Sequence, residues 1–178
     1  LANAAADTDG VQVLDAASLE QLFRAYAAED PTLDSAALSR DGVHLVAGGA
    51  GGQLFVWRWR EGRRYIKLGD QGTWIQCLTF SPRGDLLASL GEDGLVLGWD
   101  ASRLDEPQTP RVLMKATPLR EFGAISFNAD GSRLAAGDGF GGVQVIRPDT
   151  GEVDLHINGA GGIVIGVAFS PDGHRIAA

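Results

Sequence analysis

The sequence predicts an all-β fold made of repeated four-stranded antiparallel sheets, and three observations support this. A five-residue phrase occurs four times, and its copies begin 42, 47 and 42 positions apart. Short apolar runs follow each copy, and glycine turns separate them; the 25 glycines are about twice the usual share. A period of roughly 40–45 residues with short strands and glycine turns is typical of a β-propeller. The copies lie at 38–42, 80–84, 127–131 and 169–173.

The unit over residues 71–118 shows the expected four strands most clearly. Its first strand precedes Ser81-Pro82-Arg83-Gly84, in which proline and glycine favour a type I turn. Its second and third strands flank Gly91-Glu92-Asp93-Gly94, and Asp-Gly between apolar runs predicts a hairpin. A longer loop then leads to the fourth strand. The strands are expected at 75–80, 85–89, 95–99 and 111–115.

The same order predicts two further full units and a half unit at each end. The full units are expected to have strands at 34–39, 43–47, 53–59 and 63–68, and at 123–127, 132–136, 142–146 and 152–157. The half units are expected at 11–14 and 21–27, and at 165–169 and 174–178. The resulting division of 1–178 is a half blade 1–30, blades 31–70, 71–118 and 119–160, and a half blade 161–178.

One segment leaves a helical alternative open. Leu19, Leu22, Phe23 and Tyr26 recur at helical spacing within 18–28. The repeat register favours a strand there, and a helical start near 16–22 is the alternative.

A column of large residues at the third strand supports the register. Leu14, Trp57, Trp99 and Ile146 lie 43, 42 and 47 residues apart. The long interval is explained by the polar, proline-bearing stretch 105–110. We expect a surface loop there, since loops tolerate insertions and packed strands do not.

Composition excludes several classes of function. The formal net charge of −8 disfavours binding to the phosphate backbone of nucleic acids. The one cysteine, Cys77, is expected to be a small buried hydrophobe, and no zinc spacing is present. No apolar run approaches the roughly 20 residues of a membrane span, so no membrane partner is expected.

The ends of the chain suggest a piece of a longer protein. The chain begins at Leu1 without the basic segment of a signal peptide, and it stops at Ala178 inside an expected strand. We expect the remaining blades of the full-length chain to complete the ring, and we expect a cytoplasmic location.

The repeats resemble the WD40 repeat family, within the YVTN/quinoprotein-like β-propeller superfamily. The family phrase V-x-F-S-P-D-G is matched by Val167-Ala168-Phe169-Ser170-Pro171-Asp172-Gly173. The rest of the pattern is matched by Leu87-Ala88-Ser89, Glu92-Asp93-Gly94 and Trp99-Asp100. The copies are loose, as in the repeat arrays of large bacterial multidomain proteins.

The resemblance also implies a buried polar network of His, Asp, Ser or Thr, and Trp. By similarity, Asp93, Ser89 and Trp99 would occupy three of its four positions. The histidine that the family often carries before the first strand is missing, and Gly69-Asp70 stands near that place.

Two groups of residues are candidates for binding. Trp74 begins a first strand, the strand nearest the central channel, where an exposed aromatic ring would anchor a peptide. Trp59, Arg58 and Arg60 form a basic and aromatic cluster that suits an acidic partner segment. Core packing of Trp74, and a packed Trp57–Trp59 pair on a solvated hairpin, are the alternatives.

No catalytic, cofactor or metal residues are predicted. His44, His156 and His174 belong to different units, and no motif supports a nucleophile, a phosphate loop or a metal cluster. The sequence therefore predicts a non-catalytic scaffold that binds a protein or peptide. The alternatives are a sensor or regulatory propeller of a bacterial signalling or defence protein, and a TolB-like or quinoprotein-like periplasmic propeller.

Overall fold

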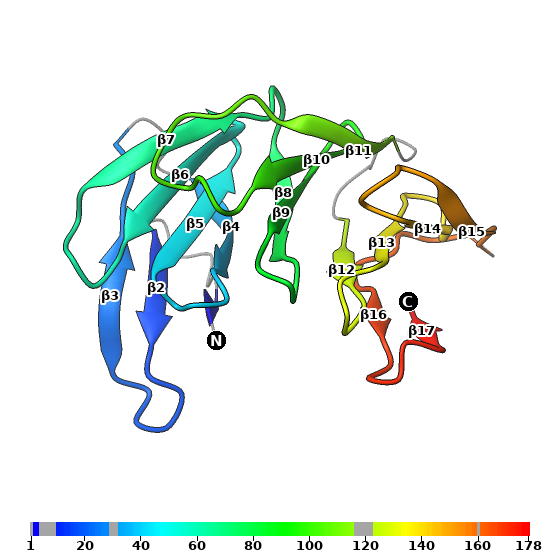
Figure 1. Cartoon of the computed structure of the whole chain (residues 1–178), viewed down its shortest axis with the longest axis horizontal. Helices are drawn as coiled ribbons and strands as arrows, with labels where there is room; N and C mark the ends of the chain where they lie inside the picture. Colours follow the sequence, from blue (N-terminus) through cyan, green and yellow to red (C-terminus); the bar gives the residue numbers. More distant parts are fainter. Residues whose placement is uncertain (1, 4–9, 29–31, 116–122, 160) are drawn as a thin grey trace.

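The computed structural model describes residues 2–3, 10–28, 32–115, 123–159 and 161–178. All regular structure in these residues is β: seventeen strands form five antiparallel sheets, drawn in Figure 1. The predicted all-β class is confirmed.

Three of the sheets have four strands, each paired with the next strand along the chain. This up-and-down order needs only short hairpin connections. The first of these sheets contains β4 (Leu33–Leu38), β5 (His44–Gly49), β6 (Gln53–Arg58) and β7 (Tyr65–Asp70). The next contains β8 (Ile75–Phe80), β9 (Leu86–Gly91), β10 (Leu95–Asp100) and β11 (Arg111–Lys115). The third contains β12 (Ile125–Phe127), β13 (Leu134–Gly137), β14 (Val143–Ile146) and β15 (Val153–Ile157).

The two end sheets are smaller and differ from the prediction. The sheet at the start has β2 (Val11–Leu14) and β3 (Gln21–Ala25), but also a third strand, β1 (Ala2–Asn3). Ala2 pairs with Val13 in β2, so β1 occupies an edge that two predicted strands would have left open. The last sheet has β16 (Ala168–Phe169) and β17 (Ile176–Ala177), both shorter than predicted.

The helix considered as an alternative after β2 is absent from the described residues 16–28. The backbone turns at residues 16–18, and Asp15 Oδ1 accepts hydrogen bonds from the amides of Ala17 and Ser18. Leu19 has a φ of 58°, which is left-handed backbone that an α-helix excludes. The aspartate turn therefore redirects the chain into β3.

The sheets follow one another around an open arc (Figure 1). The first strand of each sheet, β4, β8, β12 or β16, lies on the concave side, and β7, β11 and β15 lie on the outside. The arc has two rims. The entry rim, where the inner strands begin, contains residues 49–52, 70–74, 91–94 and 138–142. The exit rim, where the inner strands end, contains residues 39–42, 58–64, 81–84, 100–110 and 128–131.

The four repeated phrases form the turns of the exit rim. Gly42, Gly84, Gly131 and Gly173 have φ values of 69°, 80°, 70° and 72°. Residues with a Cβ rarely adopt this conformation, which explains the glycine that ends every copy.

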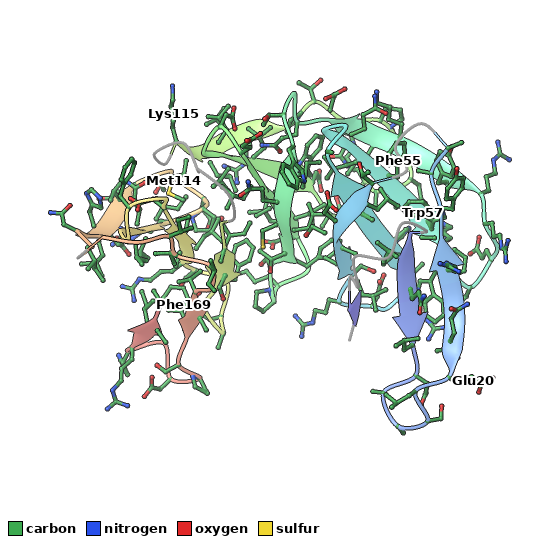
Figure 2. The ribbon with its side chains drawn as sticks, turned by 180° about the vertical axis from the view of Figure 1, so that it is seen from behind. Glu20, Phe55, Trp57, Met114, Lys115 and Phe169 are labelled. Carbon is green, nitrogen blue, oxygen red and sulfur yellow. The ribbon has the colours of Figure 1, made fainter. Side chains whose placement is uncertain are left out.

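Each pair of neighbouring sheets shares one apolar core. Leu68 of β7 packs against Leu97 and Trp99 of the next sheet, and Leu113 of β11 packs against residues of β12–β14. Phe55 and Trp57, labelled in Figure 2, pack in the same way against the sheet of β2 and β3. Full burial of one such side chain contributes about 1.5–3 kcal/mol, so every sheet depends on its neighbours.

The stretch 105–110 lies at the surface, as predicted, but the loop 101–110 that contains it also joins two sheets. Leu104 is only 2% exposed and lies in the core shared with β4–β7. Gln108 donates its backbone N–H to Leu68 O at 2.6 Å, and Gly69 lies so close to the loop that a Cβ there would meet Gln108 O at 2.8 Å. We call this loop the clasp, because it fastens one sheet to the preceding one.

Candidate interaction surfaces on the two rims

Trp74 lies on the entry rim, directly before β8. Its ring is half-buried, and its Nε1–H donates to Asp34 Oδ2 at 2.8 Å. Asp34 belongs to β4, the inner strand of the preceding sheet. The contact therefore holds the indole at the concave side, across the boundary between two sheets.

Three acidic residues belong to the segments near Trp74 on the entry rim. Asp34, Asp70 and Glu92 are all exposed, and the Glu92 backbone N–H donates to Trp74 O at 2.9 Å. Lys67 lies 3.5 Å from Asp70 and offsets part of that charge. The entry rim near Trp74 thus combines an aromatic face with an excess of negative charge.

A buried polar network supports the entry rim from below. Trp99 donates its Nε1–H to Ser89 Oγ at 2.8 Å, and Ser89 donates in turn to Gln71 Oε1. Gln71 Nε2 donates to Leu95 O at 3.1 Å. Gln71 lies in the segment 70–74, so the network holds in place the backbone that carries Trp74.

This network differs at two positions from the one that the resemblance implied. Ser89 and Trp99 take the expected places, and Gln71 completes the chain of hydrogen bonds. Asp93 instead accepts the Leu95 N–H at 3.0 Å within its own turn. The signal for Gln71 was a polar residue one position beyond Gly69-Asp70, where the family places its histidine.

Trp59 and Arg60 lie on the exit rim. Trp59 is buried, packs against Phe23 and donates Nε1–H to Gly42 O at 2.9 Å. The Arg60 guanidinium lies 4.2 Å from the centre of the Trp59 ring and also donates to Gly42 O. This stacking is a cation–π contact within the chain, so Trp59 serves as packing.

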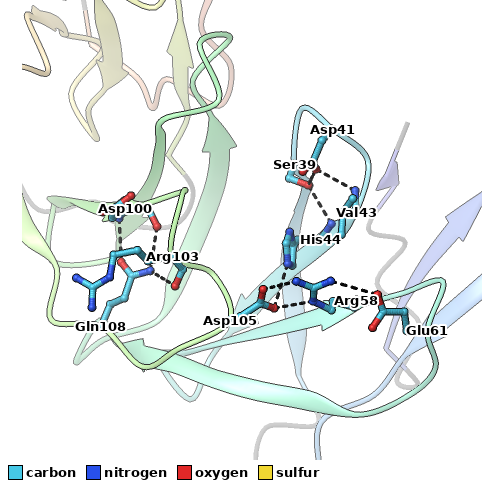
Figure 3. Close-up of polar contacts among 10 residues, drawn as sticks. All are labelled: Ser39, Asp41, Val43, His44, Arg58, Glu61, Asp100, Arg103, Asp105 and Gln108. Carbon is cyan, nitrogen blue, oxygen red and sulfur yellow. Dashed lines mark hydrogen bonds and ion pairs between the residues drawn. The ribbon is translucent and has the colours of Figure 1, made fainter.

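Arg58 is engaged on the same rim by the clasp. It donates to both carboxylate oxygens of Asp105, with Nε 2.9 Å from Oδ1, and it lies 3.2 Å from Glu61 (Figure 3). His44 Nε2 lies 3.1 Å from the same Asp105 oxygen. The hydrogen bond from Arg58 lowers the pKa of Asp105 to about 2, and Asp105 in turn raises the pKa of Arg58.

The four predicted binding residues therefore divide between opposite rims. The structure brings Trp59, Arg58 and Arg60 together on the exit rim, where each has a partner within the chain. It places Trp74 on the entry rim.

The exit rim also carries a polar cleft of about 740 Å³ between the sheets β8–β11 and β12–β15. Acidic and basic side chains both line this cleft. One of the basic residues, Arg111, already donates a hydrogen bond to Pro148 O at 2.9 Å. The charged lining residues are Asp85, Asp100, Arg103, Arg111 and Asp149.

Metal ligands, the cysteine and membrane-spanning helices can be assessed in the part of the chain that the structure describes. No three His, Cys, Asp or Glu residues among those placed are grouped to hold a metal ion. Burial raises the pKa of the Cys77 thiol, which disfavours the reactive thiolate. Within the same residues, no helix has the length and apolarity to cross a membrane.

The architecture defines a class of protein: an open, partial β-propeller of four-stranded blades. A family model described as "WD domain, G-beta repeat" matches residues 64–100. The propeller domain of Cps50 (Swd1) from Myceliophteria thermophila shares the fold, with a TM-score of 0.71 at 18% identity; the match covers 93% of this chain and 54% of that one. One unit of the chain thus matches a WD repeat model, and the fold is that of a β-propeller present as a partial ring.

Part of this chain is similar in sequence to curated proteins. Telomerase protein component 1 of Mus musculus is 26% identical over 124 residues, which is 70% of this chain and 5% of that protein. The small ribosomal subunit protein RACK1y of Oryza sativa is 31% identical over 115 residues, which is 64% of this chain and 34% of that protein. The chain thus spans about a third or less of these relatives.

Proposed function

We propose that this propeller is a non-catalytic scaffold for protein interaction, and that the entry rim around Trp74 binds a basic segment of its partner. The observation that carries the proposal is the indole of Trp74, fixed at the concave side by Asp34 on a rim that also carries the exposed residues Asp70 and Glu92. WD40 propellers in general act as interaction scaffolds, and this agrees with the matches to WD-repeat proteins.

The chemistry of the rim favours Lys or Arg in the bound segment. A cation over an indole face is stabilised by about 0.5–2 kcal/mol, according to its exposure. Asp34, Asp70 and Glu92 would attract the same cation and speed its association. Tryptophan is also among the residues that most often dominate binding energy at interfaces.

The polar network beneath the rim supports this role. Because Gln71 is fixed by Ser89 and Leu95, the segment before Trp74 is ordered before a partner arrives. A surface that is already ordered loses less conformational entropy on binding.

A displayed peptide library, selected on the immobilised protein, tests the proposal. We expect enrichment of Lys- or Arg-containing peptides that lose affinity about tenfold with Trp74→Ala and bind more weakly as salt rises. Arg60→Ala, on the opposite rim, is the matched control and should leave their binding unchanged. Selected peptides that bind Trp74→Ala as well as the native chain would refute the role of the entry rim.

We also propose the blade division 31–70, 71–118 and 119–160, with half blades 1–30 and 161–178, and a cytoplasmic location. The four-stranded sheets support the division.

A further inference from the structure

The polar cleft of about 740 Å³ on the exit rim lies at the junction between the sheets β8–β11 and β12–β15. The preceding junction, between β4–β7 and β8–β11, has a smaller hollow of about 360 Å³, which Arg58 lines. Asp100 lines the larger cleft, and it follows Trp99 directly as Arg58 follows Trp57. The two hollows therefore occupy the same place in successive units.

The two junctions differ in the loop that the later sheet contributes. The clasp reaches back from β8–β11 to the preceding sheet, where Leu104 is buried in the shared core and Asp105 binds Arg58. The counterpart of the clasp in β12–β15 is the shorter turn at residues 147–152, which joins β14 to β15. The larger cleft is thus open at the place where a loop closes the preceding junction.

Asp100 takes the place of Arg58 with the opposite charge. Arg58 is paired with the carboxylate of Asp105 from the next sheet (Figure 3). Asp100 Oδ1 accepts hydrogen bonds from the backbone N–H and the hydroxyl of Ser102, and Asp100 has no ion pair within the part of the chain that the structure describes. A guanidinium at this carboxylate would repeat the contact of the preceding junction with the charges exchanged.

Both arginines that line the cleft are already engaged. Arg103 pairs with Glu106 at 2.6 Å, and Arg111 donates to Pro148 O at 2.9 Å. A guanidinium has five N–H donors, so Arg111 keeps donors for a further acceptor. The backbone carbonyl of a bound peptide is such an acceptor.

Two of the three carboxylates that line the cleft are available to a cation. Asp149 pairs with Arg83 at 3.3 Å. Asp85 is exposed and, like Asp100, forms no ion pair among the residues that the structure places. The cleft therefore combines two anionic acceptors with one donor, which suits an arginine side chain together with a carbonyl of the same peptide.

The walls of the cleft are held at a fixed spacing. Arg83 Nε donates to Asp130 O at 2.8 Å and so joins β8–β11 to β12–β15, as the bond from Arg111 does. On the side of the clasp, Gln108 Nε2 donates to Asp100 O at 2.9 Å. A site that is ordered in advance loses less conformational entropy when a ligand binds.

We propose that this cleft binds an arginine in a peptide segment of a partner protein, and that this segment takes the place that the clasp takes at the preceding junction. The guanidinium would pair with Asp85 and Asp100, and Arg111 would donate to a neighbouring backbone carbonyl. The volume lies within the roughly 300–1,000 Å³ of ligand sites, and the polar lining suits a charged side chain. The cleft lies on the rim opposite Trp74, so this inference goes beyond the proposed function.

Titration of the protein with a blocked Gly-Arg-Gly tripeptide, followed by the NMR shifts of backbone amides, is the test. We expect saturable shifts at Gly98, Thr109 and Gly131 in the cleft, and weaker binding as salt rises. Asp85→Asn with Asp100→Asn should raise the dissociation constant about tenfold, because the guanidinium loses both charged acceptors. Asparagine keeps an oxygen for the Ser102 hydrogen bonds, so the loop should stay folded.

The matched control is Asp41→Asn with Asp172→Asn. These two carboxylates lie in turns of the same rim and outside the cleft, and the control removes the same charge. It should leave the dissociation constant within about twofold, since exposed charges at a distance are largely screened. Trp74→Ala should also leave it unchanged, which separates this site from the one proposed on the entry rim.

Shifts that are absent from the cleft, or confined to the entry rim, would overturn the proposal. An unchanged dissociation constant in the variant of Asp85 and Asp100 would do the same. Ethylguanidinium carries the cation of the tripeptide without a backbone carbonyl. If it binds as tightly as the tripeptide, the assignment of the cleft to a peptide is wrong.

Discussion

Trp99 donates its indole N–H to Ser89 Oγ across two neighbouring strands at 2.8 Å. Trp57 takes the same place in the preceding sheet: it is paired with Leu45 as Trp99 is with Leu87. Ala47 stands there in the position of Ser89, and Trp57 Nε1 is buried without an acceptor among the residues described. Two tryptophans at one repeat position thus have different polar surroundings.

Replacing each tryptophan by phenylalanine should separate packing from hydrogen bonding. Both changes remove similar apolar volume, but Trp99→Phe also leaves Ser89 in the buried network without its donor. We expect Trp99→Phe to lower the free energy of unfolding by about 1–2 kcal/mol more than Trp57→Phe. Urea denaturation of the two variants measures the difference. Equal losses would mean that the hydrogen bond contributes nothing.

Gln71→Glu should make stability depend on pH in a new way. A carboxylate at position 71 would face Leu95 O without a proton to donate, and burial would raise its pKa above the roughly 4.3 of an unfolded glutamate. The protonated variant should therefore match the native chain below about pH 4. Its stability should then fall relative to the native chain as pH rises through the folded pKa, by up to about 1.4 kcal/mol per unit. Urea midpoints of both proteins across pH 3–8 test this, and a constant difference would contradict it.

Asp105→Asn should weaken the clasp at neutral pH. The pKa of Asp105 is lowered to about 2 by Arg58, so its carboxylate stabilises the fold above the unfolded pKa of about 3.9. That contribution is lost as pH falls from about 4 to 2. Since Asp105 is about half exposed, we expect the variant to lose about 1 kcal/mol at pH 7 and the difference to close in acid.

Glu106→Gln is the control for that prediction. Glu106 pairs with Arg103, which lies in the clasp itself rather than in the neighbouring sheet. Its replacement should cost less than that of Asp105 in the same urea titration. If both variants lose the same free energy of unfolding, the Arg58–Asp105 pair between sheets stabilises the fold no more than the Arg103–Glu106 pair does.

Gly69→Ala should disturb the junction under the clasp. A Cβ at Gly69 would meet Gln108 O at 2.8 Å and the Trp99 ring closer still, so one of them must move. We expect a loss of about 1–3 kcal/mol in thermal or urea unfolding. Gly166→Ala, where nothing lies within 4 Å, should be close to neutral. A Gly69→Ala protein as stable as the native chain would show that the clasp can shift at little cost in free energy.

The strands and turns were predictable because their signals repeat locally. The phrase glycines need left-handed backbone in every unit, and the column of Trp57, Trp99 and Ile146 fixes the third strand. β1 gave no such signal, since a strand of two residues is too short for an alternating pattern.

The candidate site was predictable only in part. Trp74 could be placed at the start of an inner strand from the register alone. The role of Gln71 depends on contact with Ser89, which lies 18 residues further along the chain within the same blade. The pairing of Arg58 with Asp105 depends on segments 47 residues apart that meet only when two blades stack. A charged cluster in the sequence therefore looked available for a partner, although Asp105 of the clasp already pairs with Arg58 and Arg60 stacks on Trp59.

The clasp should change the order in which the sheets unfold. Repeat arrays usually lose their end units first, because each unit is held by its neighbours alone. Leu104 and Asp105 tie β8–β11 to β4–β7 through a loop as well as through their faces. These eight strands should act as one cooperative block whose amides exchange together, while the sheets on either side open earlier.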